Sequence, residues 1–205
     1  MIPGWWRQAS QELAAADPVL AMLVERYADT ALASRGDPFA TLARSIVGQQ
    51  ISVPAADSVW RKLAYAVPEF VPEALLATDP VTLRGAGLSA RKVEYLVDLA
   101  GHFVSGALAV ERWSAMSDAE VIAELTAVRG IGVWTAEMFL IFNLLRPDVL
   151  PLDDIGLQRA VALHYAGGER PSRRALAAQG ERWRPWRSVA TWYLWRSLDP
   201  VPVAY

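Results

Sequence analysis

The chain has 205 residues, of which 53% are hydrophobic and 20% charged, with a formal net charge of -2. This composition excludes a disordered chain and suffices for one ordinary domain or two small lobes. There are no cysteines and only two histidines, which excludes disulfides, thiolate zinc sites and iron–sulfur clusters. Because the net charge is slightly negative, any binding to DNA would require local positive charge.

The N-terminal residues MIPGWWRQAS lack the basic and apolar blocks of a signal peptide. No uninterrupted apolar run reaches the roughly 18 residues that a bilayer span requires. We therefore expect a cytoplasmic protein with no membrane association, near the nucleoid if the source is bacterial.

Almost every segment has the spacing and the end signals of a helix. Helices are expected over residues 18–34 and from residue 38, each after an Asp-Pro pair that suits a cap and a first helical position. Further helices are expected in SVPAADSVWRKLAYAV, with Ser52 as the cap, and in TDPVTLRGAG, SARKVEYLVDLAGHFVSG and SDAEVIAELTAV. Alternating strand patterns are missing, so the sequence predicts an all-α fold.

Residues 120–143 read as helix, very short turn, helix, with the turn at Gly130-Ile131-Gly132. We expect both glycines to take positive φ and to let the backbone approach another molecule closely. The second helix would then present free N–H groups and a positive dipole end, which suit a phosphate. The structural alternative is an ordinary corner with a glycine C-cap.

Residues 170–196 contain seven arginines, a single acid, Glu181, and four of the nine tryptophans. Arginines interleaved with aromatic rings suit phosphate contacts and base stacking. The alternative is a solvated helix face beside a buried aromatic seam, and the segment alone does not separate the two.

Two adjacent acids, Asp153 and Asp154, precede the helical pattern IGLQRAVALHYA. Aspartate is a preferred N-cap, so one of them has an evident structural role. A carboxylate beside so much apolar sequence also suits a chemical role.

The stretch LTAVRGIGVWTAEMF, followed by DVLPLDD, resembles the helix-hairpin-helix–Gly-Pro-Asp superfamily of DNA glycosylases, and most of all its alkylbase branch, DNA-3-methyladenine glycosylase II. DPFATLARSIVGQQIS, GLSARKVEYLVDLA and ERWRPWRSVATWYLWR are similar to that branch in order and spacing, so the resemblance covers most of residues 17–196. It implies one all-α catalytic domain over residues 1–205, with two lobes, a cleft between them and no iron–sulfur cluster.

The resemblance also implies roles for individual residues. Asp154 is expected to be the catalytic carboxylate, stabilising positive charge on the sugar and assisting water, with Asp153 as a supporting acid. Trp134, Met138, Ile155 and Trp195 are expected to line the base pocket, although core packing is the alternative for the two tryptophans. The family's best-studied pattern has tyrosines at the positions of Met138 and Ile155, so a different range of bases is expected here.

DNA contacts are implied at two turns. Gln50 matches the wedge that fills the space of a flipped nucleotide, where some relatives have leucine, while Gln49 is an alternative hydrogen-bonding residue at the same turn. Gly130, Ile131 and Gly132 are expected to bind a DNA phosphate. The backbone carbonyls of Thr126, Val128 and Ile131 match a monovalent cation site, and no other cofactor is expected.

Trp134 stands where strand-cleaving relatives have a lysine, so no Schiff base with the sugar is expected there. The prediction is a monomeric, monofunctional DNA glycosylase of base excision repair. It would act on double-stranded DNA with damaged bases, excise purines of the 3-methyladenine and 7-methylguanine type and leave an abasic site. Two alternatives are a non-catalytic, structure-specific DNA-binding module with the same hairpin and an all-α protein with no DNA role.

Overall fold

The computed structural model describes residues 2–198, so the ends of the predicted 1–205 domain lie outside the described residues. Over this range the chain forms thirteen α-helices and no strand, which confirms the all-α prediction. The described residues divide into two compact units, the first made of residues 2–34 and 140–198 and the second of residues 35–139. None of the described helices combines the length and the apolar character needed to cross a membrane.

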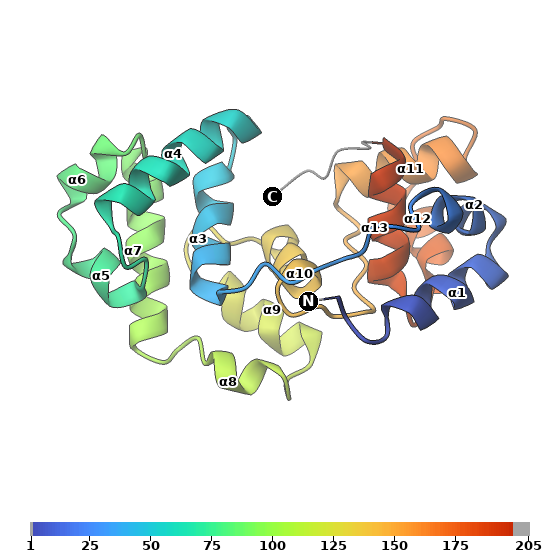
Figure 1. Cartoon of the computed structure of the whole chain (residues 1–205), viewed down its shortest axis with the longest axis horizontal. Coiled ribbons are helices and arrows are strands. Elements are labelled where there is room, and N and C mark those ends of the chain that lie inside the picture. The colour runs from blue at the N-terminus through green and yellow to red at the C-terminus, as the bar shows by residue number, and fades with distance from the viewer. Residues whose placement is uncertain (1, 199–205) are drawn as a thin grey trace. The chain divides into compact units, whose positions relative to one another are not determined.

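The second unit is organised around α7. Its helices are α3 (Pro38–Gly48), α4 (Val53–Ala66), α5 (Pro72–Ala77), α6 (Pro80–Gly85), α7 (Ala90–Val104), α8 (Val110–Trp113), α9 (Asp118–Thr126) and the first part of α10 (Val133–Phe142). Helix α7 packs against α3, α5 and α6, and α4 packs against α3 and α6 (Figure 1). Phe39 lies against Phe103 at 5.3 Å between ring centroids, and Trp113 against Phe139 at the same distance. These apolar contacts hold the helices that carry the two turns predicted to meet DNA.

The first unit is organised around α13 (Arg187–Leu198), which packs against α1 (Trp6–Ala16), α2 (Pro18–Arg26) and α11 (Ile155–Tyr165). Helix α12 (Arg173–Glu181) completes this unit. Residues 188–194 of α13 are all buried, as expected for a helix surrounded by other elements rather than one with a solvent face. Trp195, one of the predicted pocket residues, follows this buried run directly.

Side-chain caps are present at the helix starts for which the sequence predicts them. Asp17, Asp37, Ser52 and Ser89 each accept a hydrogen bond from a backbone N–H in the first turn of the following helix. Ser117 forms a full capping box with Glu120. Each cap satisfies an N–H group that has no partner within the helix.

The predicted end of the helix at residues 18–34 is wrong, because α2 stops at Arg26. Tyr27 leaves the helical conformation, and its hydroxyl donates to the carbonyl of Arg196 at 2.7 Å. Thr30 then donates its hydroxyl to the carbonyl of Tyr27 at 2.9 Å. A tertiary contact with α13 therefore replaces the last two turns that the local pattern favoured.

Candidate active site

Asp154 is both the N-cap of α11 and a buried carboxylate, with 7% of the residue exposed. Its Oδ1 accepts hydrogen bonds from the backbone N–H of Leu157 at 2.6 Å and from the indole Nε1 of Trp195 at 2.7 Å. The first bond is the capping interaction, and the second comes from a different helix. Together they hold the carboxylate in one orientation. The structural and chemical interpretations of Asp154 are therefore compatible.

Packing also holds Trp195 in place. Its ring stacks on Phe142, with centroids 5.6 Å apart and planes at 15°. A Cβ added to Gly156 would lie 3.1 Å from both the Trp195 ring and Asp154 Oδ1, so the approach of indole to carboxylate depends on a glycine there. Neither Phe142 nor Gly156 was predicted from the sequence as a site residue. A glycine in the first turn of a predicted helix, two residues after the acid, was the available signal.

Asp153 has a different environment from its neighbour. Its side chain is 67% exposed and forms an ion pair with Arg173 of α12, whose side chain is 63% exposed. An exposed pair of this kind adds little stability. The two acids therefore differ in environment. Asp154 is buried and hydrogen-bonded to the indole of Trp195, while Asp153 is exposed and forms an ion pair with Arg173.

The other predicted pocket residues differ in exposure. Trp134 is 37% exposed and Ile155 68% exposed, whereas Met138 is buried at 6%. Trp134 and Met138 are on α10 in the second unit, and Ile155 begins α11 in the first. An exposed aromatic ring at the start of α10 is consistent with a binding role for Trp134, while the burial of Met138 indicates packing.

At the hairpin only one of the two glycines behaves as predicted. Gly130 has φ of +87°, and a Cβ added there would overlap the ring of Tyr95 on α7. Gly132 is not in the positive-φ region, and a Cβ added to it would meet nothing within 4 Å. The prediction of positive φ is therefore wrong for Gly132, because a single left-handed residue suffices to close the corner. Gly132 is exposed and has no side chain, so the backbone just before α10 is accessible.

Gln49 and Gln50, in the turn after α3, have different environments. Gln49 is the C-cap of α3, and its Nε2 donates to the carbonyl of Gly130 at 2.8 Å. Gln50 is exposed and holds φ of +59°, a conformation that a non-glycine residue rarely adopts. Gln49 is therefore the internal hydrogen-bonding residue, and Gln50 is the residue presented to solvent.

Three of the seven arginines at residues 170–196, namely Arg173, Arg184 and Arg187, form ion pairs within the protein. Arg184 and Arg187 both form ion pairs with Asp148 and with Glu181. The Arg196 guanidinium lies 4.6 Å from the ring centroid of Trp192, which is buried. These contacts favour the aromatic-seam interpretation for residues 184–196. Because Asp148 lies outside the segment, a count of charges within it overstated the local positive charge.

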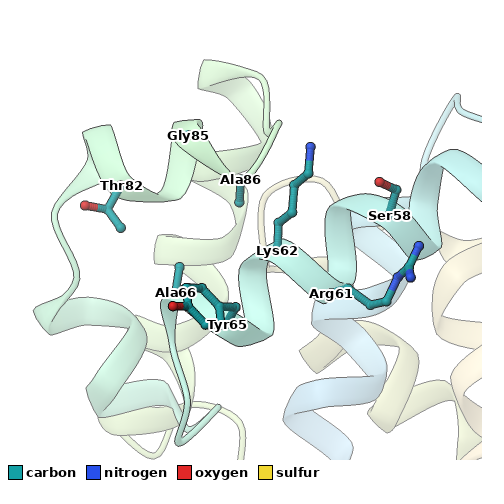
Figure 2. Close-up of a pocket in the computed structure, with 8 residues that line it drawn as sticks. All are labelled: Ser58, Arg61, Lys62, Tyr65, Ala66, Thr82, Gly85 and Ala86. Atoms are coloured by element: carbon teal, nitrogen blue, oxygen red, sulfur yellow. The ribbon is translucent and has the colours of Figure 1, made fainter.

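Two cavities lie away from the predicted site residues. One, of about 540 Å³, lies in the second unit; Figure 2 shows Lys62 and Tyr65 of α4 on one side of it and Thr82 and Gly85 of α6 on the other. The second, of about 680 Å³, lies in the first unit beside Trp6 and Tyr193. Neither is lined by a residue of the predicted base pocket.

An all-helical chain with a helix-hairpin-helix corner and, further on, a buried aspartate at a helix start belongs to the class of helix-hairpin-helix proteins. The sequence pattern of the HhH-GPD superfamily of base excision DNA repair proteins matches residues 43–185. This chain therefore belongs to the HhH-GPD superfamily.

Named relatives agree with this assignment. The chain is 31% identical to DNA-3-methyladenine glycosylase 1 of Schizosaccharomyces pombe, over 87% of this chain and 80% of that protein. It spans 66% of the DNA-3-methyladenine glycosylase of Bacillus subtilis, at 29% identity.

Solved structures give the same fold. A DNA-3-methyladenine glycosidase from Bacillus halodurans matches with a TM-score of 0.79 and 38% identity, over 83% of this chain and 79% of that one. The 3-methyladenine DNA glycosylase of Schizosaccharomyces pombe in complex with abasic DNA matches with a TM-score of 0.81 and 29% identity, over 93% of this chain and 96% of that one.

Proposed function

We propose that this chain is a monofunctional DNA glycosylase, acting as a monomer on double-stranded DNA and hydrolysing the bond between sugar and base at alkylated purines. The observation that carries the proposal is Asp154, a buried carboxylate fixed by Leu157 and Trp195 in a member of a base excision repair superfamily. The names of its relatives support 3-methyladenine as a substrate, and the proposal extends to other cationic purines of the 7-methylguanine type.

The chemistry follows from the charge that develops when the bond breaks. Departure of the base leaves the sugar with positive, oxocarbenium-like character. A carboxylate that is already oriented and poorly hydrated stabilises this charge without reorganising during the reaction. The same group is suited to orient the attacking water or to accept its proton. The hydrogen bonds from Leu157 and Trp195 supply the orientation that this role requires.

Base recognition is assigned to the indoles of Trp134 and Trp195. Alkylated purines of the proposed type carry positive charge, and an electron-rich ring attracts such a cation by about 0.5–2 kcal/mol, depending on desolvation. The partial exposure of Trp134 supports this role. Ile155 is exposed and apolar, and Met138 is buried, so the lesion range is expected to differ from that of relatives with tyrosines at these two positions.

DNA contacts are assigned to the two turns of the second unit. Gln50 would fill the space that the flipped nucleotide leaves, and its exposure supports this. The corner at Gly130, Ile131 and Gly132 would bind a phosphate through backbone groups, a contact that positions the duplex without reading its sequence. A monovalent cation at the carbonyls of Thr126, Val128 and Ile131 stays a prediction; the Val128 carbonyl already accepts one hydrogen bond, from Ile131 at 3.1 Å, and retains a second lone pair for a cation.

The experiment that tests this function is product analysis on duplexes with a single defined lesion. We expect a free base and an intact strand bearing an abasic site, with no enzyme–DNA adduct trapped by borohydride. The reason is that the chain has only two lysines, Lys62 and Lys92, and neither is at the hairpin. A bifunctional glycosylase serves as the positive control for trapping. Efficient formation of an adduct through any side chain would contradict hydrolysis as the mechanism.

A second test addresses the phosphate contact. Replacing Gly132 by valine is expected to weaken binding to damaged and undamaged duplex by a similar factor of roughly 10, about the value of one lost charge-assisted hydrogen bond. The open space around Gly132 means that the added side chain would occupy the place of the phosphate rather than disturb the fold. Discrimination between lesion and normal base should survive. Wild-type binding by a folded variant would show that this corner is a plain turn.

A further inference from the structure

Lys92, on α7, bridges to the turn that carries Gln50. Its Nζ donates to the carbonyl of Val47 at 2.7 Å and to the carbonyl of Gln49 at 2.8 Å, both at the C-terminal end of α3. Carbonyls at a helix C-terminus point outward and carry partial negative charge, so an ammonium group is favourable there. Burial lowers the pKa of the Lys92 ammonium from its ordinary value. The lysine is thus a partly desolvated link between two helices rather than a surface charge.

The same turn is linked onward to the hairpin. Gln49, whose carbonyl accepts from Lys92, donates its own side-chain amide to the carbonyl of Gly130. Hydrogen bonds therefore run from Lys92 through Gln49 to the glycine that closes the corner. All of these residues belong to the second unit.

Helix α7 contacts the hairpin through Tyr95 and Asp98, three and six residues after Lys92. The Tyr95 ring lies where a Cβ on residue 130 would be. The Asp98 carboxylate accepts the backbone N–H of Arg129 at 2.8 Å and lies 3.3 Å from the Arg129 guanidinium. Side chains three apart lie on the same side of a helix. One side of α7 therefore supports both the turn after α3 and the hairpin corner.

We propose that Lys92 is a positioning residue for base flipping: together with Gln49 it fixes the turn that carries Gln50 relative to the hairpin corner. This inference rests on the proposed glycosylase function. If the corner holds a phosphate and Gln50 enters the duplex, the distance between them must match the spacing between that phosphate and the vacated stack. Without the hydrogen bonds of Lys92, Gln50 and the hairpin corner can each still contact DNA, but the distance between them no longer matches the duplex. Base flipping is therefore expected to weaken more than binding to undamaged DNA.

The test uses the full chain with three lysine variants, Lys92→Met, Lys92→Arg and Lys62→Met. The last is a matched control, because it removes the only other lysine with the same loss of charge, at the cavity between α4 and α6. The measurements are single-turnover release of 7-methylguanine from a defined duplex, fluorescence of 2-aminopurine opposite the lesion as a reporter of flipping, and the Kd for undamaged duplex.

A misplacement of about 1 Å in a catalytic arrangement can cost roughly 100-fold in rate, so we expect Lys92→Met to slow release by about 10-fold or more. Its fluorescence change on binding should shrink, while its Kd for undamaged duplex stays within about twofold of wild type. Lys92→Arg, which retains donors for both carbonyls, should recover most of the rate, and Lys62→Met should behave as wild type. Gln49→Leu, which removes the neutral link to Gly130, should shift rate and fluorescence in the same direction.

Wild-type release and fluorescence in Lys92→Met would overturn this inference and leave the proposed function standing. Lys92→Met could instead lose base release and binding to undamaged duplex by the same factor. If Lys92→Arg then shows the same loss and Gln49→Leu shows none, the inference is also overturned and Lys92 has a structural role. If the wild-type protein itself releases no base, the proposed function fails and the inference fails with it.

Discussion

Replacing Asp154 by asparagine is expected to lower the rate of base release by about 100- to 1,000-fold, the cost of removing one preorganised electrostatic contact from an active site. The amide retains an Oδ1 acceptor, so the hydrogen bonds from Leu157 and Trp195 can persist. Asparagine is also as good an N-cap as aspartate. The variant should therefore keep its fold and its affinity for abasic DNA while losing the charge that faces the sugar.

The matched control is Asp153→Asn, which changes an exposed acid paired with Arg173. This variant should retain most of the wild-type rate, because an exposed ion pair has little effect on a buried site. Circular dichroism and thermal unfolding of both variants check the fold. Near-wild-type release by Asp154→Asn would refute the assignment, and equal losses in the two variants would mean that both acids act in the reaction.

Replacing Gly130 by alanine is expected to destabilise the protein by about 2–5 kcal/mol. Holding a non-glycine residue at φ of +87° costs about 1–2 kcal/mol, and overpacking against the Tyr95 ring typically adds about 1–3 kcal/mol. For a chain of this size, each kcal/mol corresponds to roughly 2–4 °C in Tm, so a fall of about 4 °C or more should be seen by calorimetry.

Gly132→Ala serves as the control for this effect. It lies two residues away, outside the positive-φ region and with open space around the added Cβ, so its Tm should stay within about 2 °C of wild type. A stable Gly130→Ala variant would contradict the packing of Gly130 on Tyr95. Equal destabilisation by the two variants would mean that the corner needs two unrestricted residues, as the sequence alone suggested.

The fold could be predicted where the determining interactions are local. The capping residues Asp17, Asp37, Ser52 and Ser89 predicted the starts of α2, α3, α4 and α7, because a cap needs only its own first turn. The end of α2 could not be predicted in this way, because it is set by a hydrogen bond from Tyr27 to Arg196, far along the chain. Asp154 has one interaction of each kind. Its capping role is local and could be predicted, whereas its hydrogen bond to Trp195 depends on the packing of α11 against α13.

The arginine-rich segment shows the same limit for charge. Seven arginines against one acid at residues 170–196 left a phosphate-binding patch and a solvated face beside an aromatic seam as alternatives. Asp148 and Asp153, which form ion pairs with three of these arginines, precede the segment in sequence. The role of Lys92 was not predicted either, because its acceptors are backbone carbonyls of another helix, which every residue possesses. Motif spacing identified the turns of the hairpin and of Gln50, and the contacts that join them required the structure.

The most direct test of the central claim is chromatographic detection of free bases released from methylated double-stranded DNA by the purified wild-type protein. The proposed function predicts that 3-methyladenine and 7-methylguanine accumulate well above the spontaneous rate, with one abasic site for each base released. Asp154→Asn, assayed in parallel, should release both bases about 100- to 1,000-fold more slowly than the wild type. Binding of methylated DNA by the wild-type protein without release of any base would contradict the claim and identify a non-catalytic DNA-binding module.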